Sequence, residues 1–170
     1  MSSFRPVVCI LVAGLLAGCG FRPLYSETSQ FDVIQEFSEI QVAPIKDRIG
    51  QQLKNELELL LHSRGKAVKP RYRLSASLTE GKSSLAVKKS AVATRANLRL
   101  ESRFLLFRVA TGRSVESWRN TITVSYNILD SEFATLMAEK DARKRAIQEL
   151  AQEARVTLGA VLGREEQRSP

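Results

Sequence analysis

Positively charged side chains recur in the central part of the sequence at a spacing suited to binding an anionic ligand. In residues 71–79 and 92–109, polar and apolar residues alternate, and this period of two is typical of strands with one buried face. Many of the polar positions are arginine, and three lysines lie between the two segments. The candidate ligand-binding residues are Arg71, Arg73, Arg95, Arg99 and Arg103, with Lys82, Lys88 and Lys89 in the expected loop.

The expected ligand of these cations is a phosphorylated molecule. The chain has 26 Lys and Arg against 18 Asp and Glu, a formal net charge of +8, which favours anionic partners. Tyr72 and Phe104 alternate toward the buried side, so the cations lack a base-stacking platform and nucleic acid is not an expected partner. Arginine and lysine bind phosphate well. The alternative is a solvated face whose charge is balanced by Glu80, Glu101 and Glu116.

Cys19 is a candidate for covalent modification. Arg5 precedes an apolar run at residues 7–17 that has the length of a signal-peptide core and is too short to span a bilayer. The run ends in Leu16-Ala17-Gly18-Cys19, which resembles the lipobox of lipoprotein signal peptidase, after whose cleavage the cysteine carries a diacylglycerol and an N-acyl chain. The alternative is an ordinary secretory signal with a chance cysteine. Cleavage removes Cys9, so no disulfide is expected.

The residues give little support for catalysis. His62 is the sole histidine, and a hydrolase would have to be built on it, whereas a histidine at the surface or boundary of a helix is the simpler interpretation. No cluster has the spacing of a metal site or of a phosphate-binding glycine loop. We therefore expect neither an enzyme nor a cofactor beyond the covalent lipid on Cys19.

The sequence around these residues predicts two helices and four strands. Apolar residues at 40 and 42, followed by Pro44, predict a short first strand. A helix follows, capped by Asp47 and ended by Gly65. The two alternating segments predict two further strands, and Ala110-Thr111-Gly112-Arg113 predicts a tight turn into a fourth strand over residues 115–126.

The last helix is expected to begin after Asp130 or Ser131. Its predicted apolar stripe consists of Phe133, Leu136, Met137, Ile147, Leu150, Ala154, Leu158 and Val161. This order of elements predicts an α+β, two-layer sandwich, in which two helices pack on one face of a mixed four-stranded sheet and leave the other face open.

The sequence divides into four parts. We expect residues 1–18 to be a signal peptide that is removed, and residues 19–38 to be a lipid-anchored tether. Residues 39–163 form a single domain, because a chain of this length has room for one core. Residues 164–170 are expected to be a disordered tail.

Two segments carry a resemblance to a known family. Residues 16–25, Leu-Ala-Gly-Cys-Gly-Phe-Arg-Pro-Leu-Tyr, look like the opening of the LPS-assembly lipoprotein family, LptE, in its alphaproteobacterial form. Residues 40–55, Ile-Gln-Val-Ala-Pro-Ile-Lys-Asp-Arg-Ile-Gly-Gln-Gln-Leu-Lys-Asn, are similar to that family's first strand and the start of its first helix. The lipobox is common to many lipoproteins, so the specificity lies in residues 20–25 and in the second segment.

The resemblance implies a function without catalysis. Members of the family occupy the lumen of the LptD β-barrel in a 1:1 complex, help the barrel assemble, and bind lipopolysaccharide during its transport to the outer leaflet. It also implies an outer-membrane lipid anchor, to which the absence of Asp at Gly20 adds support, with the domain on the periplasmic side. Arg95, Arg99 and Lys88 are then the first candidates for lipopolysaccharide contact. The alternative is an envelope scaffolding lipoprotein that binds another periplasmic protein or peptidoglycan through its open sheet face.

Overall fold

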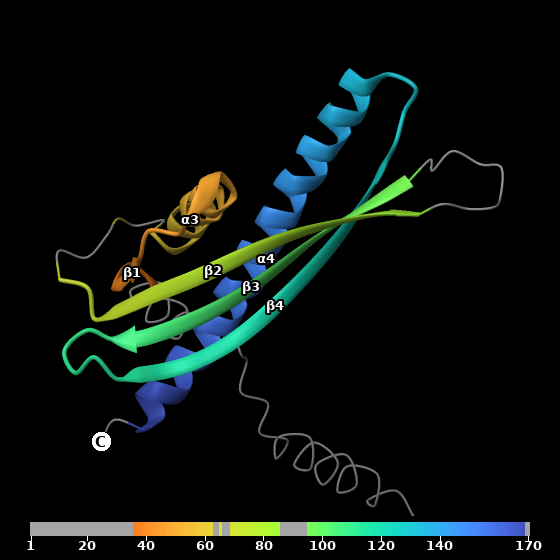
Figure 1. Cartoon of the computed structure of the whole chain (residues 1–170). Coiled ribbons are helices and arrows are strands. Elements are labelled where there is room, and N and C mark those ends of the chain that lie inside the picture. The colour runs from red at the N-terminus through yellow and green to blue at the C-terminus, as the bar shows by residue number, and fades with distance from the viewer. Residues whose placement is uncertain (1–35, 63–64, 66–68, 86–94, 169–170) are drawn as a thin grey trace, which may run out of the picture. The chain divides into compact units, whose positions relative to one another are not determined.

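The domain is built on a sheet of three long strands and one short one. A computed structural model describes residues 36–62, 65, 69–85 and 95–168. Its strands are β1 (Ile40–Val42), β2 (Tyr72–Leu85), β3 (Arg95–Arg108) and β4 (Ser114–Asn127). They lie in the order β1-β2-β3-β4, with β1 parallel to β2 and the other neighbours antiparallel (Figure 1). The predicted mixed four-stranded sheet is confirmed.

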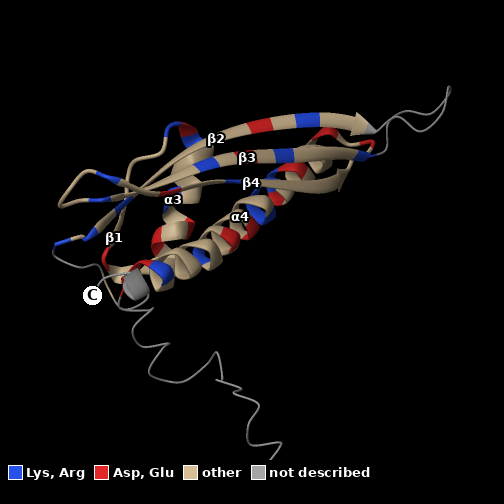
Figure 2. Cartoon of the chain, turned by 90° about the horizontal axis from the view of Figure 1, so that it is seen from below, with Lys and Arg blue, Asp and Glu red and all other residues tan. Residues whose placement is uncertain are grey.

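Two helices cover one face of this sheet. They are α3 (Asp47–Leu61), which connects β1 to β2, and α4 (Glu132–Arg168), which follows β4. Both lie on the same side of the sheet, and the opposite side carries no helix among the described residues (Figure 2). The predicted two-layer α+β sandwich is therefore confirmed. Neither helix has an apolar run long enough to span a membrane.

The core lies between the sheet and the two helices, and α3 contributes Leu53, Leu57 and Leu61 to it. Even-numbered residues of β3, among them Leu98, Leu100 and Phe104, are fully buried on the helix side. Phe104 stacks on Trp118 of β4, with 5.1 Å between the ring centroids. The part of α4 that faces them is rich in small residues, which let the helix approach the sheet closely. Its fully buried residues are Ala142, Ala146, Leu150, Ala151, Ala154, Leu158 and Leu162.

Several details differ from the sequence-based predictions. Asp47 adopts a positive φ of 65° and begins α3 without a capping side-chain hydrogen bond at that end. At α4, the Ser131 hydroxyl accepts a hydrogen bond from the Ala134 N–H, so Ser131 is the cap. β2 runs on to Leu85, beyond the predicted strand.

Both ends of α4 also differ from prediction. Phe133, Leu136 and Met137 were assigned to the apolar stripe, but their exposures of 72%, 59% and 45% place them outside the core. The prediction of a disordered tail from residue 164 was wrong as far as Arg168, where α4 ends. Arg164 pairs with Glu116, and this contact to β4 helps explain why the helix continues. The predicted signal peptide and most of the tether lie outside the described residues.

Gly50 allows a close approach at the start of α3. A Cβ atom at this position would lie 2.6 Å from Cγ2 of the buried Ile45, whereas one at Gly163 in α4 would meet nothing within 4 Å. We therefore expect Gly50→Ala to lower the free energy of unfolding by about 1–3 kcal/mol, through overpacking. Gly163→Ala should raise it by up to about 1 kcal/mol, because alanine favours the helix. Urea unfolding of both variants tests this, and a Gly50→Ala midpoint at or above that of the wild type would contradict the packing.

Candidate ligand-binding face

The side of the sheet without helices, here called the open face, consists of the odd-numbered side chains of β2, of β3 and of β4 from Ser117 onward. Successive side chains of a strand point to opposite faces, and the even-numbered residues of β3 are buried under α4. The odd-numbered positions therefore point away from the helices. Along β3 they include Arg95, Arg99, Glu101 and Arg103, all of which are exposed.

Five arginines and one glutamate make the open face strongly positive. Arg73 of β2 and Arg119 of β4 join the three arginines of β3. Arg99 pairs with Glu101 at 2.8 Å (Nε to Oε1), and both side chains are more than half exposed. This surface pair contributes little stability, so Arg99 is easily released to another anion.

Arg103 and Arg119 are the most distinctive pair on this face. They are directly opposite each other in the register of β3 and β4. Side chains in this relation lie about 5 Å apart, and like charges there destabilise the sheet. Both are exposed, and neither forms an ion pair within the described part of the chain. An anion between the two guanidinium groups would remove the repulsion and accept charge-assisted hydrogen bonds from both.

Hydroxyl side chains surround these arginines. On β2, Ser77 is aligned with Arg103 and Thr79 with Glu101. On β4, Thr121 and Thr123 are aligned with Glu101 and Arg99. Each hydroxyl can donate one hydrogen bond and accept others. The open face therefore combines donors for phosphate with donors and acceptors for sugar hydroxyls.

The open face becomes apolar toward one end. Leu105 and Phe107 of β3 are odd-numbered and partly exposed, and Phe107 is aligned with Arg73. Apolar side chains next to cations suit a molecule that carries both an anionic group and hydrocarbon.

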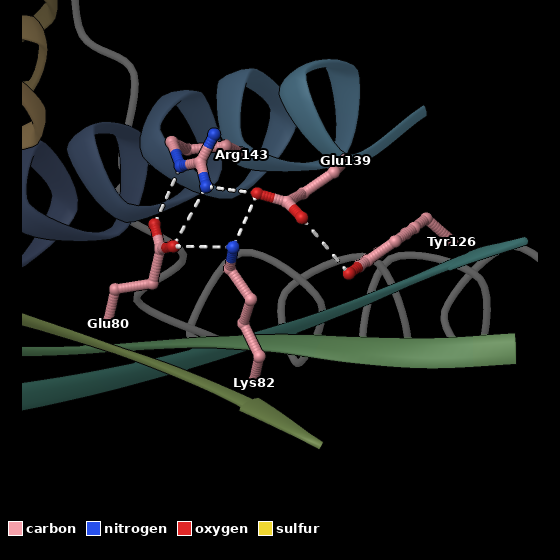
Figure 3. Close-up of polar contacts among 5 residues, drawn as sticks. All are labelled: Glu80, Lys82, Tyr126, Glu139 and Arg143. Atoms are coloured by element: carbon pink, nitrogen blue, oxygen red, sulfur yellow. Dashed lines mark hydrogen bonds and ion pairs between the residues drawn. The ribbon is translucent and has the colours of Figure 1, made fainter. Parts of the chain in front are cut away.

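Lys82 does not belong to the open face, and the prediction that it lies in a loop was wrong. It lies within β2 at an even position, because the strand is longer than predicted, and it points toward α4. Its Nζ is 2.6 Å from Oε1 of Glu139 and 3.9 Å from Oε1 of Glu80 (Figure 3). Its charge is thus balanced within the domain.

Lys82 belongs to an ionic network that fastens α4 to the sheet. Arg143 of α4 donates two hydrogen bonds to Glu80 of β2, at 2.7 and 2.8 Å, and one to Glu139 at 2.6 Å. The Tyr126 hydroxyl of β4 donates to the second oxygen of Glu139 at 3.4 Å. These residues come from three elements, and two carboxylates balance two cations (Figure 3).

The network shifts the pKa values of its members. The hydrogen bond from Lys82, helped by that from Arg143, holds the pKa of the Glu139 carboxyl below its usual value near 4.5, against the opposing effect of burial. Burial, and then the charge of Glu139, raise the pKa of the Tyr126 hydroxyl. Hydrogen bonding to Glu80 raises the pKa of the Arg143 guanidinium. The network is therefore most stable when the Glu139 carboxylate is ionised.

The remaining predicted residues are placed as follows. Arg71 precedes β2, and its guanidinium lies 5.5 Å from the ring centre of Tyr72, at the end of the open face. Lys88, Lys89 and Cys19 lie outside the described residues. The face thus brings together Arg73, Arg95, Arg99 and Arg103 of the predicted set.

Arg119 was missed by the sequence analysis. The alternation of β4 contained the signal, because Trp118, Ile122 and Val124 are even-numbered and the odd-numbered Arg119 therefore falls on the other side. Its pairing with Arg103 was not readable, because it depends on the register. A bulge near Leu106 and Phe107 shifts that register.

His62 has a structural contact. It follows the last residue of α3, and its Nε2 donates a hydrogen bond of 2.8 Å to the Ile40 carbonyl of β1. The ring thereby ties the end of α3 to the first strand.

A groove of about 770 Å³ runs between α3 and α4, on the side away from the open face. Apolar side chains including Ile49, Leu136 and Met137 line it, together with cations such as Arg48 and Lys144. The sequence analysis did not predict this groove, because it assigned Leu136 and Met137 to the core.

Comparison with solved structures identifies the class of fold. A protein from Caulobacter crescentus CB15, described as a lipoprotein, matches with a TM-score of 0.65 at 22% identity, covering 79% of this chain and 98% of that one. A minor lipoprotein from Acinetobacter baumannii matches with a TM-score of 0.60 at 20% identity, covering 72% of this chain and 92% of that one. Rare lipoprotein B from Shewanella oneidensis matches with a TM-score of 0.58 at 12% identity, covering 75% of this chain and 96% of that one. No protein-family model and no curated protein matches the sequence. The chain therefore shares the α+β fold of these three proteins.

The ionic network generates a pH-dependent prediction. The folded pKa of Glu139 lies below its unfolded value, so its contribution is complete above about pH 4.5 and is lost as the pH falls through the folded pKa. We expect Glu139→Gln to lower the free energy of unfolding by about 1–3 kcal/mol at neutral pH, and this difference to shrink in acid. Urea unfolding at a series of pH values measures it.

Asp141→Asn is the matched control, because Asp141 lies on the same helix and forms only an exposed pair with Arg145. It should change the free energy of unfolding by less than about 0.5 kcal/mol. Equal effects of the two variants at every pH would show that the network does not stabilise α4.

Proposed function

We propose that this chain is an outer-membrane lipoprotein, acylated at Cys19, that binds lipopolysaccharide through its open face. The observation that carries the proposal is the pair Arg103 and Arg119, two exposed arginines aligned on neighbouring strands without a carboxylate between them. Lipopolysaccharide carries phosphate groups that suit guanidinium donors. It also carries sugar hydroxyls and acyl chains, which match the hydroxyl-lined centre and the apolar end of the face.

The proposal extends to a partner. By its resemblance to the LptE family over residues 16–25 and 40–55, the chain would occupy the lumen of an LptD-like barrel, in a 1:1 complex, and assist the barrel's assembly. The lumen of such a barrel is polar. A domain whose exposed sheet face carries arginine and hydroxyl groups is compatible with that environment. The likeness to three proteins described as lipoproteins supports the fold that this role requires.

Charge reversal on the open face tests ligand binding. We expect Arg103→Glu with Arg119→Glu to weaken binding of purified lipopolysaccharide to the full-length chain at least tenfold, since two charge-assisted contacts are lost. Arg95→Glu with Arg99→Glu should also weaken it. The control is Lys140→Glu with Lys144→Glu, which makes the same charge change at exposed positions on α4. If the Lys140→Glu, Lys144→Glu variant lost as much affinity as the Arg103→Glu, Arg119→Glu variant, net charge rather than the open face would govern binding.

Purification from native membranes tests the anchor and the partner. We expect mass spectrometry to show a diacylglyceryl group on Cys19 and to detect a large β-barrel in stoichiometric amount with the tagged chain. Cys19→Ala should abolish the lipid, while leaving the domain's unfolding midpoint unchanged. A non-barrel periplasmic protein or peptidoglycan in place of the barrel would favour the scaffolding function, and an unmodified thiol would contradict the lipoprotein assignment.

A further inference from the structure

The outer edge of β4 pairs with no strand in the described residues, and of its outward N–H groups the one of Ser117 donates to Oε1 of Glu116 at 3.2 Å. β4 is the last strand in the sheet order, so it pairs only with β3. The hydrogen bond from the Val109 N–H to the Arg71 carbonyl (2.9 Å) shows that odd-numbered residues of β3 direct their backbone toward β2. Even-numbered residues of β3 therefore bond to β4, where they are aligned with even-numbered residues, as Leu100 is with Ile122. The odd-numbered residues of β4 thus direct their backbone N–H and C=O groups outward.

The composition of this edge favours pairing with another strand. Asn120–Asn127 contains no charged residue and no proline, and four consecutive residues, Thr121 to Val124, are β-branched. Free edges are normally protected by charges, proline or short length. β2 shows such protection where β1 no longer covers it, because Glu80 and Lys82 flank Gly81 there. The edge of β4 lacks it from Asn120 onward.

Arg119 favours a negatively charged residue on any strand that is added at the edge of β4. On the open face, a residue of an added strand aligned with Arg119 would lie about 5 Å away. Arg103 occupies the corresponding position on the other side, so a carboxylate on the added strand would relieve the repulsion between the two arginines. A second copy of β4 cannot supply that group. Its open-face residues from Ser117 to Asn127 include no Asp or Glu.

We propose that the edge of β4 from Ser117 to Ser125 accepts an extended segment of another protein, with Asp or Glu aligned with Arg119. The outward backbone groups of Arg119, Thr121, Thr123 and Ser125 form the ladder together with the Ser117 carbonyl, and the acidic residue gives the register. This mode of binding does not depend on the partner being a barrel or on the binding of lipopolysaccharide.

A peptide probe tests the edge directly. The probe is a labelled nine-residue peptide of alternating threonine and valine with a central glutamate, and its matched peptide has a central lysine. Fluorescence anisotropy measures binding to the full-length chain purified in detergent. We expect the glutamate peptide to bind at least tenfold more tightly than the lysine peptide, and Arg119→Glu to reverse that preference.

Proline substitution separates the edge from the rest of the sheet. Thr123→Pro removes an outward N–H without removing a bond to β3, so the fold should persist while peptide affinity falls at least tenfold. Ser84→Pro is the matched control, since Ser84 lies on the free edge of β2 with its N–H also outward, and it should leave affinity unchanged. Hydrogen exchange should show new protection at Thr121, Thr123 and Ser125 when the glutamate peptide is bound.

Three results would overturn the proposal. They are equal binding of the two peptides, unchanged affinity in both Thr123→Pro and Arg119→Glu, and protection appearing on β2 instead of β4. A dimer of the chain that Thr123→Pro dissociates would assign the edge to a second copy. The outcomes for Thr123→Pro and for hydrogen exchange are independent of the lipopolysaccharide and barrel experiments, whereas Arg119→Glu also tests the open face.

Discussion

The structure depends on covering one side of a sheet whose three long strands are each 14 residues long. A strand of that length places half of its side chains on either face, and in β3 the even-numbered half is almost entirely apolar. Burial of these residues is the main favourable contribution to folding. A single helix, α4, covers most of this apolar surface, and its alanines at 142, 146, 151 and 154 let it lie close to the strands. The length of α4 follows from the length of the strands that it covers.

The same alternation exposes the other half of each strand to solvent. On that side the chain has arginine, serine and threonine, with only Glu101 among the acidic residues of β2, β3 and β4. On the helix side the situation is reversed, because most half-buried cations described there have an acidic partner, as Arg143 has Glu80 and Glu139, while Arg155 lies against the Phe37 ring. The domain therefore neutralises charge where it is packed and leaves charge unbalanced where it is open. That asymmetry is the reason for proposing the open face as a binding surface.

The sequence predicted the arrangement of the elements well, because period-two and helical spacing are local signals. The four strands, the two covering helices and the open-face position of Arg95, Arg99 and Arg103 all follow from that spacing. Contacts between distant segments were not predictable in this way. The sequence analysis assigned Lys82 to a loop of the ligand site. It could not show that β2 continues through Lys82 or that Glu139 lies beside it, because both depend on tertiary packing.

The errors in α4 have a similar origin. The helical period of Phe133, Leu136 and Met137 matches that of the buried residues farther along, but no strand or helix covers them in the described structure. Periodicity shows which residues share a face of a helix, and only the tertiary structure shows how far the covering surface extends. Cys19, Lys88 and Lys89 lie outside the described residues and remain predictions.

The position of α3 makes the two ends of the sheet mechanically unequal. Near β1, the strands are packed by α3 and α4 together, and His62 links α3 to β1. Toward the other end of β2, α4 alone covers the sheet, and the network of Glu80, Lys82, Glu139 and Arg143 fastens it (Figures 1 and 3). Regions with fewer buried apolar contacts open locally at a lower free-energy cost than the whole domain. The end of the sheet near β1 should therefore open locally at a higher free-energy cost than the end that α4 alone covers.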